Sequence, residues 1–154
     1  MKHEKQKILA AFDLETSGLD PAVHDIIEIA IVPLNPDFKR SDLPEFTARI
    51  KAVHPENADP ESLKISGLNP FEGEDIQKVA TDITMWMEDN HIERIEAVGH
   101  NLRFDLDFFQ IKFPSLSRIF SSIVTTVCNL LSLSMIFLYC KRGRNFFQAS
   151  VCGI

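Results

Sequence analysis

The chain has 154 residues, of which 45% are hydrophobic and 25% are charged, as expected for one globular domain with a genuine core. All 22 acidic residues lie at or before Asp107, whereas five of the 16 basic residues and no acidic ones follow it. This asymmetry indicates an acidic, cation-binding first part, a basic partner-binding tail, or a tail of different origin. The first seven residues, MKHEKQK, lack the apolar core of a signal peptide, so we expect a cytoplasmic protein.

Three strand-like segments come first along the chain. Residues 7–15 are apolar nearly throughout, as in a buried strand, and residues 24–34 are rich in β-branched side chains. Residues 45–51 alternate between apolar and polar side chains, which predicts a third strand.

Helix signals follow these strands. In residues 54–70, Asp59 is predicted to cap a short helix that has Pro60 at its first position and ends at Gly67. Residues 71–90 predict a longer amphipathic helix, whose tryptophan we interpret as a core residue rather than a ligand platform. Its apolar stripe consists of Ile76, Val79, Ile83, Trp86 and Met87.

A fourth strand and a last helix complete the regular part. Residues 95–101 predict a short strand, and residues 102–113 predict a helix with Phe104, Phe108 and Ile111 on one face. The order of strands and helices indicates an α/β fold with a mixed sheet. In such folds the functional site lies at the carboxyl ends of the central strands.

The segment 119–140 contains no charged residue and is followed by the basic stretch KRGR. Its length fits a membrane span, but its many serines and threonines argue against one, and residues 121–127 also predict a buried strand. The odd number of cysteines and the lack of a CxxC pair predict free thiols rather than a zinc site or a disulfide framework. These cysteines are Cys128, Cys140 and Cys152.

Two carboxylates mark the end of the first strand. Asp13 and Glu15 are two residues apart, so in a strand they project from the same face. Adjacent anions repel each other unless a cation lies between them, and hard divalent cations such as Mg²⁺ prefer carboxylate oxygens. A pair of unpartnered surface acids is the alternative interpretation.

A second group of polar residues follows the fourth strand. Asp105 lies in the first turn of the predicted helix, where Asn101 is the predicted N-cap. Asp107 is only two residues further along the helix, so it cannot face the same way as Asp105. Taken alone, Asp105 is also explained as an acid favoured near a helix N-terminus.

The stretches FDLETSGLD (12–20) and HNLRFD (100–105) together resemble the first two motifs of the DEDD superfamily of 3′-5′ exonucleases. The closer resemblance is to the bacterial branch around the proofreading epsilon subunit of DNA polymerase III, whose linker resembles residues 54–70. The resemblance implies a ribonuclease-H-like mixed sheet with flanking helices, incomplete at the C-terminus. It divides the chain into an exonuclease-like domain, 1–128, and a divergent tail, 129–154.

The resemblance also implies an activity, which is phosphodiester hydrolysis assisted by two divalent ions, Mg²⁺ or Mn²⁺. The implied partners are a single-stranded or 3′-terminal nucleic acid and a polymerase subunit. By motif match, the catalytic metal ligands are Asp13, Glu15 and Asp105, with Asp13 bridging both ions. The implied lining of the 3′-terminal nucleotide is Thr16, Ser17, Gly18 and Leu19. The implied supporting residues are His100, Asn101 and Phe104, none of them the general base.

The third motif of this superfamily carries a fourth carboxylate and a base, and this sequence has no counterpart for it. No acid follows Asp107, no histidine follows His100, and the resemblance fades near residue 129. We therefore expect a truncated or frame-shifted descendant in which hydrolysis is impaired or absent, because a general base contributes about 10²–10⁴-fold. Two alternatives stay open. One is a non-catalytic domain that binds nucleic acid or protein, using Lys141, Arg142 and Arg144. The other is a domain anchored in a membrane through residues 119–140.

Overall fold

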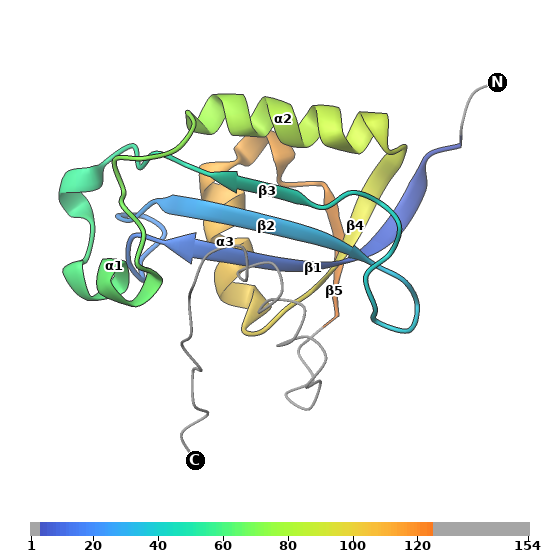
Figure 1. Ribbon diagram of the computed structural model, residues 1–154, viewed down its shortest axis with the longest axis horizontal. Helices are drawn as coiled ribbons and strands as arrows, with labels where there is room; N and C mark the ends of the chain where they lie inside the picture. Colours follow the sequence, from blue (N-terminus) through green and yellow to red (C-terminus); the bar gives the residue numbers. More distant parts are fainter. Residues whose placement is uncertain (1–3, 125–154) are drawn as a thin grey trace, which may run out of the picture.

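The protein is described here by a computed structural model, in which residues 4–124 are described. A single five-stranded sheet forms its centre, in the spatial order β3-β2-β1-β4-β5 (Figure 1). The first three strands are antiparallel, whereas β4 runs parallel to β1 and β5 runs parallel to β4. The strands are β1 (Gln6–Thr16), β2 (Ile26–Leu34), β3 (Phe46–Arg49), β4 (Ile92–Val98) and β5 (Phe120–Val124).

Three α-helices connect these strands, and each predicted helix is present. In α1 (Pro60–Ser66) the Asp59 side chain accepts hydrogen bonds from the backbone N–H groups of the first turn, and Gly67 ends the helix in a left-handed conformation with φ 68°. The other two helices are α2 (Ile76–Asp89) and α3 (Leu102–Lys112). Short 3₁₀ turns cover Pro55–Asn57 and Pro114–Leu116. The predicted strands and the predicted Asp59 cap are therefore confirmed, although β4 begins and ends three residues earlier than predicted.

The main core lies between one face of the sheet and the helices α2 and α3, which both pack on that face. Even-numbered residues of β1, among them Phe12, point into it. The Phe12 ring meets Phe109 of α3 edge-on at 5.6 Å, and Phe120 of β5 lies against both rings. Trp86 is 9% exposed and donates from Nε1 to a backbone carbonyl oxygen at 2.9 Å, which confirms it as a core residue.

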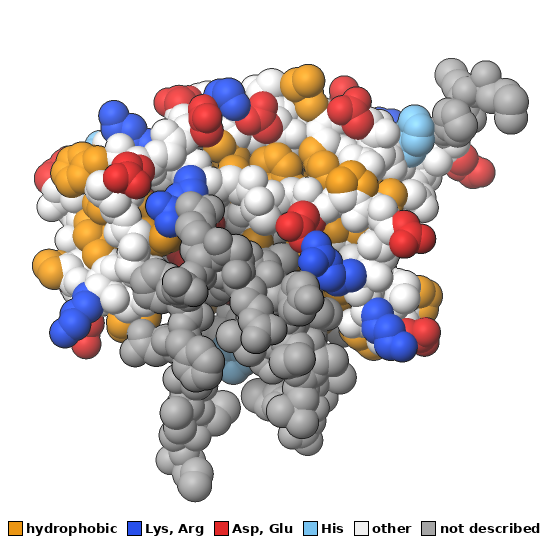
Figure 2. Space-filling view, in the orientation of Figure 1, with side chains coloured by type: hydrophobic (Ala, Val, Ile, Leu, Met, Phe, Trp, Pro, Cys, Tyr) orange, Lys and Arg blue, Asp and Glu red, His pale blue; other side chains and the backbone are white. Residues whose placement is uncertain are grey.

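The opposite face of the sheet carries a smaller apolar cluster with residues from three strands. Its buried members are Ala11, Val32, Leu34 and Val98. On the outer side of the molecule, acidic side chains predominate along α2, with a single lysine among them (Figure 2). On the face of the sheet that carries this smaller cluster, the odd-numbered residues of β1 run from the apolar cluster to the carboxylates at the end of the strand.

One prediction for α3 is wrong. Ile111 is 54% exposed, and the buried face of the helix is formed by Leu102, Asp105, Leu106, Phe108 and Phe109. A buried carboxylate in the middle of this face breaks the apolar stripe, so the periodicity of the sequence indicated the wrong edge of the helix.

Two predictions for the last third of the chain are only partly testable. Residues 120–124 form β5, as the strand interpretation of this segment expects, and no helix within residues 4–124 has the length and apolar character to cross a membrane. The rest of the segment 119–140, the three cysteines and the tail 129–154 lie outside the described residues.

Candidate active site

Asp13 and Glu15 lie near the carboxyl end of β1 and are both half-buried. They alternate with Phe12 and Leu14, which point into the main core, so the two carboxylates share the opposite face. On β2 the residue directly opposite Glu15 is Glu28. Both predicted ligands on β1 are thus on one face of a central strand.

The start of α3 approaches β1 at the place where β4 ends. Pairing between β1 and β4 stops at Ala11 and Val98, so the next residues of β1 have no strand beside them on that side. Gly99 makes the turn possible, because a Cβ at this position would lie 2.7 Å from the carbonyl oxygen of Phe12. The chain then enters α3 directly beside the carboxylates of β1.

Asp105 lies beside the part of β1 that has no neighbouring strand, and it connects the two sequence motifs. Its Oδ1 accepts a hydrogen bond of 3.0 Å from the backbone N–H of Leu14, and the residue is only 4% exposed. Burial first, and then the negative charges of Asp13 and Glu15, together raise the pKa of the Asp105 carboxyl to about 8, against the opposing effect of the Leu14 N–H. The three predicted ligands are therefore close enough to repel one another.

These three carboxylates fit a divalent cation in donor chemistry and in charge. They supply hard oxygen ligands, and among residues 4–124 no positive charge offsets the two neighbouring anions that raise the pKa of the buried Asp105 carboxyl. As the side chains stand within residues 4–124, however, no three Asp, Glu, His or Cys side chains are arranged to hold an ion. Binding of one ion by all three carboxylates would therefore require these side chains to rearrange.

The turn that follows β1 is held by local hydrogen bonds. Thr16 Oγ1 donates to the carbonyl oxygen of Gly18 at 2.7 Å, and Ser17 is fully buried. A Cβ on Gly18 would lie only 2.1 Å from the His24 ring, so only glycine fits here without displacing the histidine. Leu19, the next residue along the chain, is 76% exposed and presents an apolar side chain at the surface.

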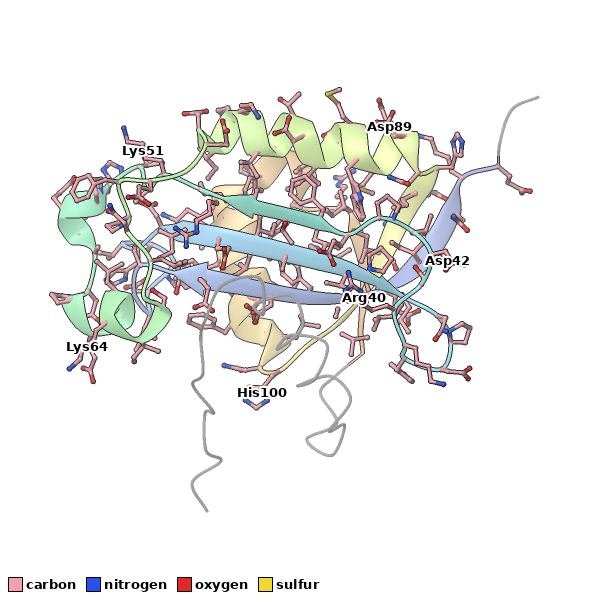
Figure 3. The ribbon with its side chains drawn as sticks, in the orientation of Figure 1. Arg40, Asp42, Lys51, Lys64, Asp89 and His100 are labelled. Carbon is pink, nitrogen blue, oxygen red and sulfur yellow. The ribbon has the colours of Figure 1, made fainter. Side chains whose placement is uncertain are left out.

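The three predicted supporting residues differ in their surroundings. Figure 3 shows His100 at the edge of the molecule, pointing away from the sheet, and this residue is exposed. Asn101 occupies the predicted N-cap position of α3, in a left-handed conformation with φ 50°, but its side chain does not make the capping hydrogen bond expected of an N-cap asparagine. Phe104 is half-buried with its ring 5.0 Å from that of Phe108, in keeping with a structural role.

Sequence reasoning missed two residues that the structure places beneath this turn. Asp25 is 2% exposed and forms an ion pair with Lys112 at the end of α3, with Oδ1 and Nζ 3.0 Å apart. The two residues are 87 positions apart, so no local motif or periodicity connects them.

The sequence of the chain matches the family model described as exonuclease, of the RNase T type, over residues 10–136. This match covers most of the chain, including both motifs. The chain belongs to this exonuclease family, within the DEDD superfamily of 3′-5′ exonucleases.

Solved structures with the same fold include exonuclease I from Methylocaldum szegediense. It is 20% identical with a TM-score of 0.64, and the match covers 84% of this chain and 29% of that one. A zinc-bound complex of E. coli exonuclease I with single-stranded DNA is 22% identical with a TM-score of 0.59, and the match covers 71% of this chain and 24% of that one.

A complex of E. coli exonuclease I with a dA16 oligonucleotide is 21% identical with a TM-score of 0.62, over 94% of this chain and 33% of that one. The exonuclease-family chain thus spans about a third or less of these relatives, and at such identities the likeness confirms the ribonuclease-H-like fold alone. The closer resemblance to the epsilon subunit stays a prediction.

Proposed function

We propose that this domain binds the 3′ end of a single-stranded nucleic acid at a divalent-metal site and carries the chemistry of a 3′-5′ exonuclease in impaired form. The observation that carries the proposal is the burial of Asp105 beside Asp13 and Glu15, at the carboxyl end of a central strand. Family membership supports the reaction class, and the oligonucleotide complexes of exonuclease I support the substrate class.

In this proposal Asp13, Glu15 and Asp105 hold Mg²⁺ or Mn²⁺. The bound ions would neutralise the phosphate and activate a water molecule for attack on phosphorus. The residues of the chain itself position the substrate. The backbone of the turn at residues 16–18 faces the terminal nucleotide, and the exposed Leu19 packs against its base.

The proposal of impairment rests on residues that this sequence does not contain. No Asp or Glu follows Asp107 and no His follows His100, so the segment after α3 offers neither a fourth carboxylate nor a histidine base. His100 itself is exposed and points away from the sheet. We expect turnover at least about 10²-fold below that of a domain with a base, in line with the usual contribution of general-base catalysis.

The experiment uses a 5′-fluorescent single-stranded oligonucleotide and measures binding by anisotropy and shortening on a gel, with Mn²⁺ and with EDTA. We expect Mn²⁺-dependent binding that prefers a free 3′-hydroxyl, with slow shortening or none. Rapid shortening that Asp13→Ala abolishes would contradict the impairment. Binding that is independent of Mn²⁺ and varies only with salt concentration would instead support a non-catalytic nucleic-acid-binding domain.

A polymerase subunit as partner is a further proposal, which rests on the epsilon resemblance of the sequence alone. Co-elution of the chain with a bacterial polymerase III core in gel filtration would support it. Separate elution at micromolar concentrations of both would contradict it.

A further inference from the structure

Asp25 is a buried carboxylate that the proposed chemistry does not use. It lies just before β2 and is 2% exposed. Its Oδ2 accepts a hydrogen bond of 2.7 Å from the backbone N–H of His54, in the loop after β3. Its Oδ1 accepts one of 3.0 Å from Lys112 Nζ, and the side chains of this ion pair are 3% and 15% exposed.

The backbone of Asp25 holds the turn that follows β1. Its carbonyl oxygen accepts a hydrogen bond from the N–H of Ser17 at 2.8 Å, and its own N–H donates to Ser17 Oγ at 2.9 Å. The carbonyl oxygen of Ser17 in turn accepts from the N–H of Asp59, the capping residue of α1, at 2.7 Å. The position of Asp25 therefore fixes the position of the turn.

Lys112 connects the end of α3 to Asp25, and therefore to the same turn. It lies seven residues, or two helical turns, after Asp105, so both side chains are on one side of the helix. Near its start, α3 is bonded to β1 through Asp105 and the Leu14 N–H, and at its end it is bonded to Asp25 through Lys112. These two bonds fix the rotation and the axial position of the helix relative to the turn.

A buried ion pair at such a place contributes little net stability. Taking two charges out of water costs several kcal/mol, so a buried pair is often no better than well-packed apolar side chains. Hydrogen bonds between charged groups are directional and therefore define a single geometry, whereas apolar contacts constrain the geometry more weakly. The pair therefore suits a role in fixing geometry.

We propose that Asp25 and Lys112 are positioning residues for the exonuclease site. They set the spacing between the turn that receives the 3′-terminal nucleotide and the helix that carries Asp105. The inference rests on the proposed function, in which these two features share one substrate. It predicts that breaking the pair disturbs recognition of the 3′ end more than it disturbs folding.

The test compares Lys112→Met with Lys112→Arg, which keeps the charge, and with Lys78→Met, which removes an exposed cation of α2. For each variant we would measure the melting temperature and the Kd for one oligonucleotide with a 3′-hydroxyl or a 3′-phosphate, in Mn²⁺. Lys112→Gln, which keeps a donor without charge, replaces the Met variant if that one does not fold.

We expect Lys112→Met to weaken binding of the 3′-hydroxyl strand about tenfold or more and to lose the preference over the 3′-phosphate strand, since small displacements of positioned groups are costly. Lys112→Arg should restore the preference, and Lys78→Met should not change it. A lower melting temperature with an unchanged preference would show a purely structural pair and overturn the proposal.

Failure of the proposed function gives a different result. In that case the wild-type chain binds neither Mn²⁺ nor the oligonucleotide. Hydrogen exchange of the backbone amides of Leu14 and Ser17 then decides whether the pair positions the turn and the helix. Faster exchange of both amides in folded Lys112→Met supports positioning, and unchanged protection of either one contradicts it.

Discussion

The backbone N–H of Leu14 donates a hydrogen bond of 3.0 Å to the Asp105 carboxyl, across 91 residues of sequence. This bond joins the two motifs that carry the exonuclease resemblance. It also places a nearly buried acid beside Asp13 and Glu15, and the pKa of Asp105 rises to about 8 as a result. The site therefore gathers negative charge around a buried acid, so we expect its stability to depend on pH and, under the proposed function, on a bound cation.

The first prediction concerns Asp105 and the free energy of unfolding without metal. The pKa of this carboxyl is near its ordinary value of 3.8 in the unfolded chain and near 8 in the folded chain. At a pH between these two values, the folded state therefore holds a proton that the unfolded state has lost. The stability of the wild type should fall as pH rises from about 4 to about 8, at up to about 1.4 kcal/mol per pH unit.

Asp105→Asn keeps an oxygen for the Leu14 N–H and removes this titration. In EDTA, the variant should gain stability over the wild type as pH rises, by an amount on the order of several kcal/mol at pH 8. Urea unfolding at pH 5 and pH 8 measures this difference. An equal stability difference at both pH values would show that Asp105 is not protonated in the folded chain.

The second prediction concerns Gly18 and His24. The Cβ of Gly18→Ala would overlap the His24 ring, which Asp20 holds through Nδ1, so the histidine or the turn must move. We expect a loss of about 1–3 kcal/mol in the free energy of unfolding, typical of overpacking, together with weaker oligonucleotide binding.

The double variant Gly18→Ala with His24→Ala removes the overlap and serves as the control. It should recover most of the stability that Gly18→Ala loses, measured against His24→Ala alone. Strictly additive losses in this double-mutant cycle would mean that the contact between the two residues is not the cause.

The third prediction tests which face of α3 is buried. Phe109 is fully buried and contacts Phe12, Phe113 and Phe120, so Phe109→Ala should cost about 3–5 kcal/mol in the free energy of unfolding. Ile111→Ala, on the exposed side of the same helix, should stay within about 0.5 kcal/mol. Urea unfolding of both variants measures the contrast, and comparable losses would contradict the orientation of the helix.

Local signals in the sequence predicted much of the fold. The apolar run before Asp13 and the capping pattern around Asp59 and Gly67 depend on neighbouring residues alone, and the structure confirms each of them. The shared face of Asp13 and Glu15 follows from the two-residue period of a strand, and it was predictable for the same reason.

Contacts between distant segments limited the rest of the prediction. Sequence periodicity treats Asp105 as a polar break, and only tertiary structure shows that the open edge of β1 buries it. The left-handed conformation of Asn101 and the exposure of Ile111 follow from the same placement of α3. The pair of Asp25 and Lys112 depends on how the sheet and the helix meet, so neither residue stands out in the sequence.

The most direct test of the account is a calorimetric titration of Mn²⁺ into the wild-type chain and into two matched variants. Asp13→Ala removes a predicted ligand, whereas Asp107→Ala removes an acid that pairs with Arg103 on the outer side of the same helix as Asp105. The account predicts saturable binding that Asp13→Ala abolishes and Asp107→Ala preserves. Equal Mn²⁺ affinity in all three chains, or no binding to the wild type, would contradict a metal site at Asp13, Glu15 and Asp105.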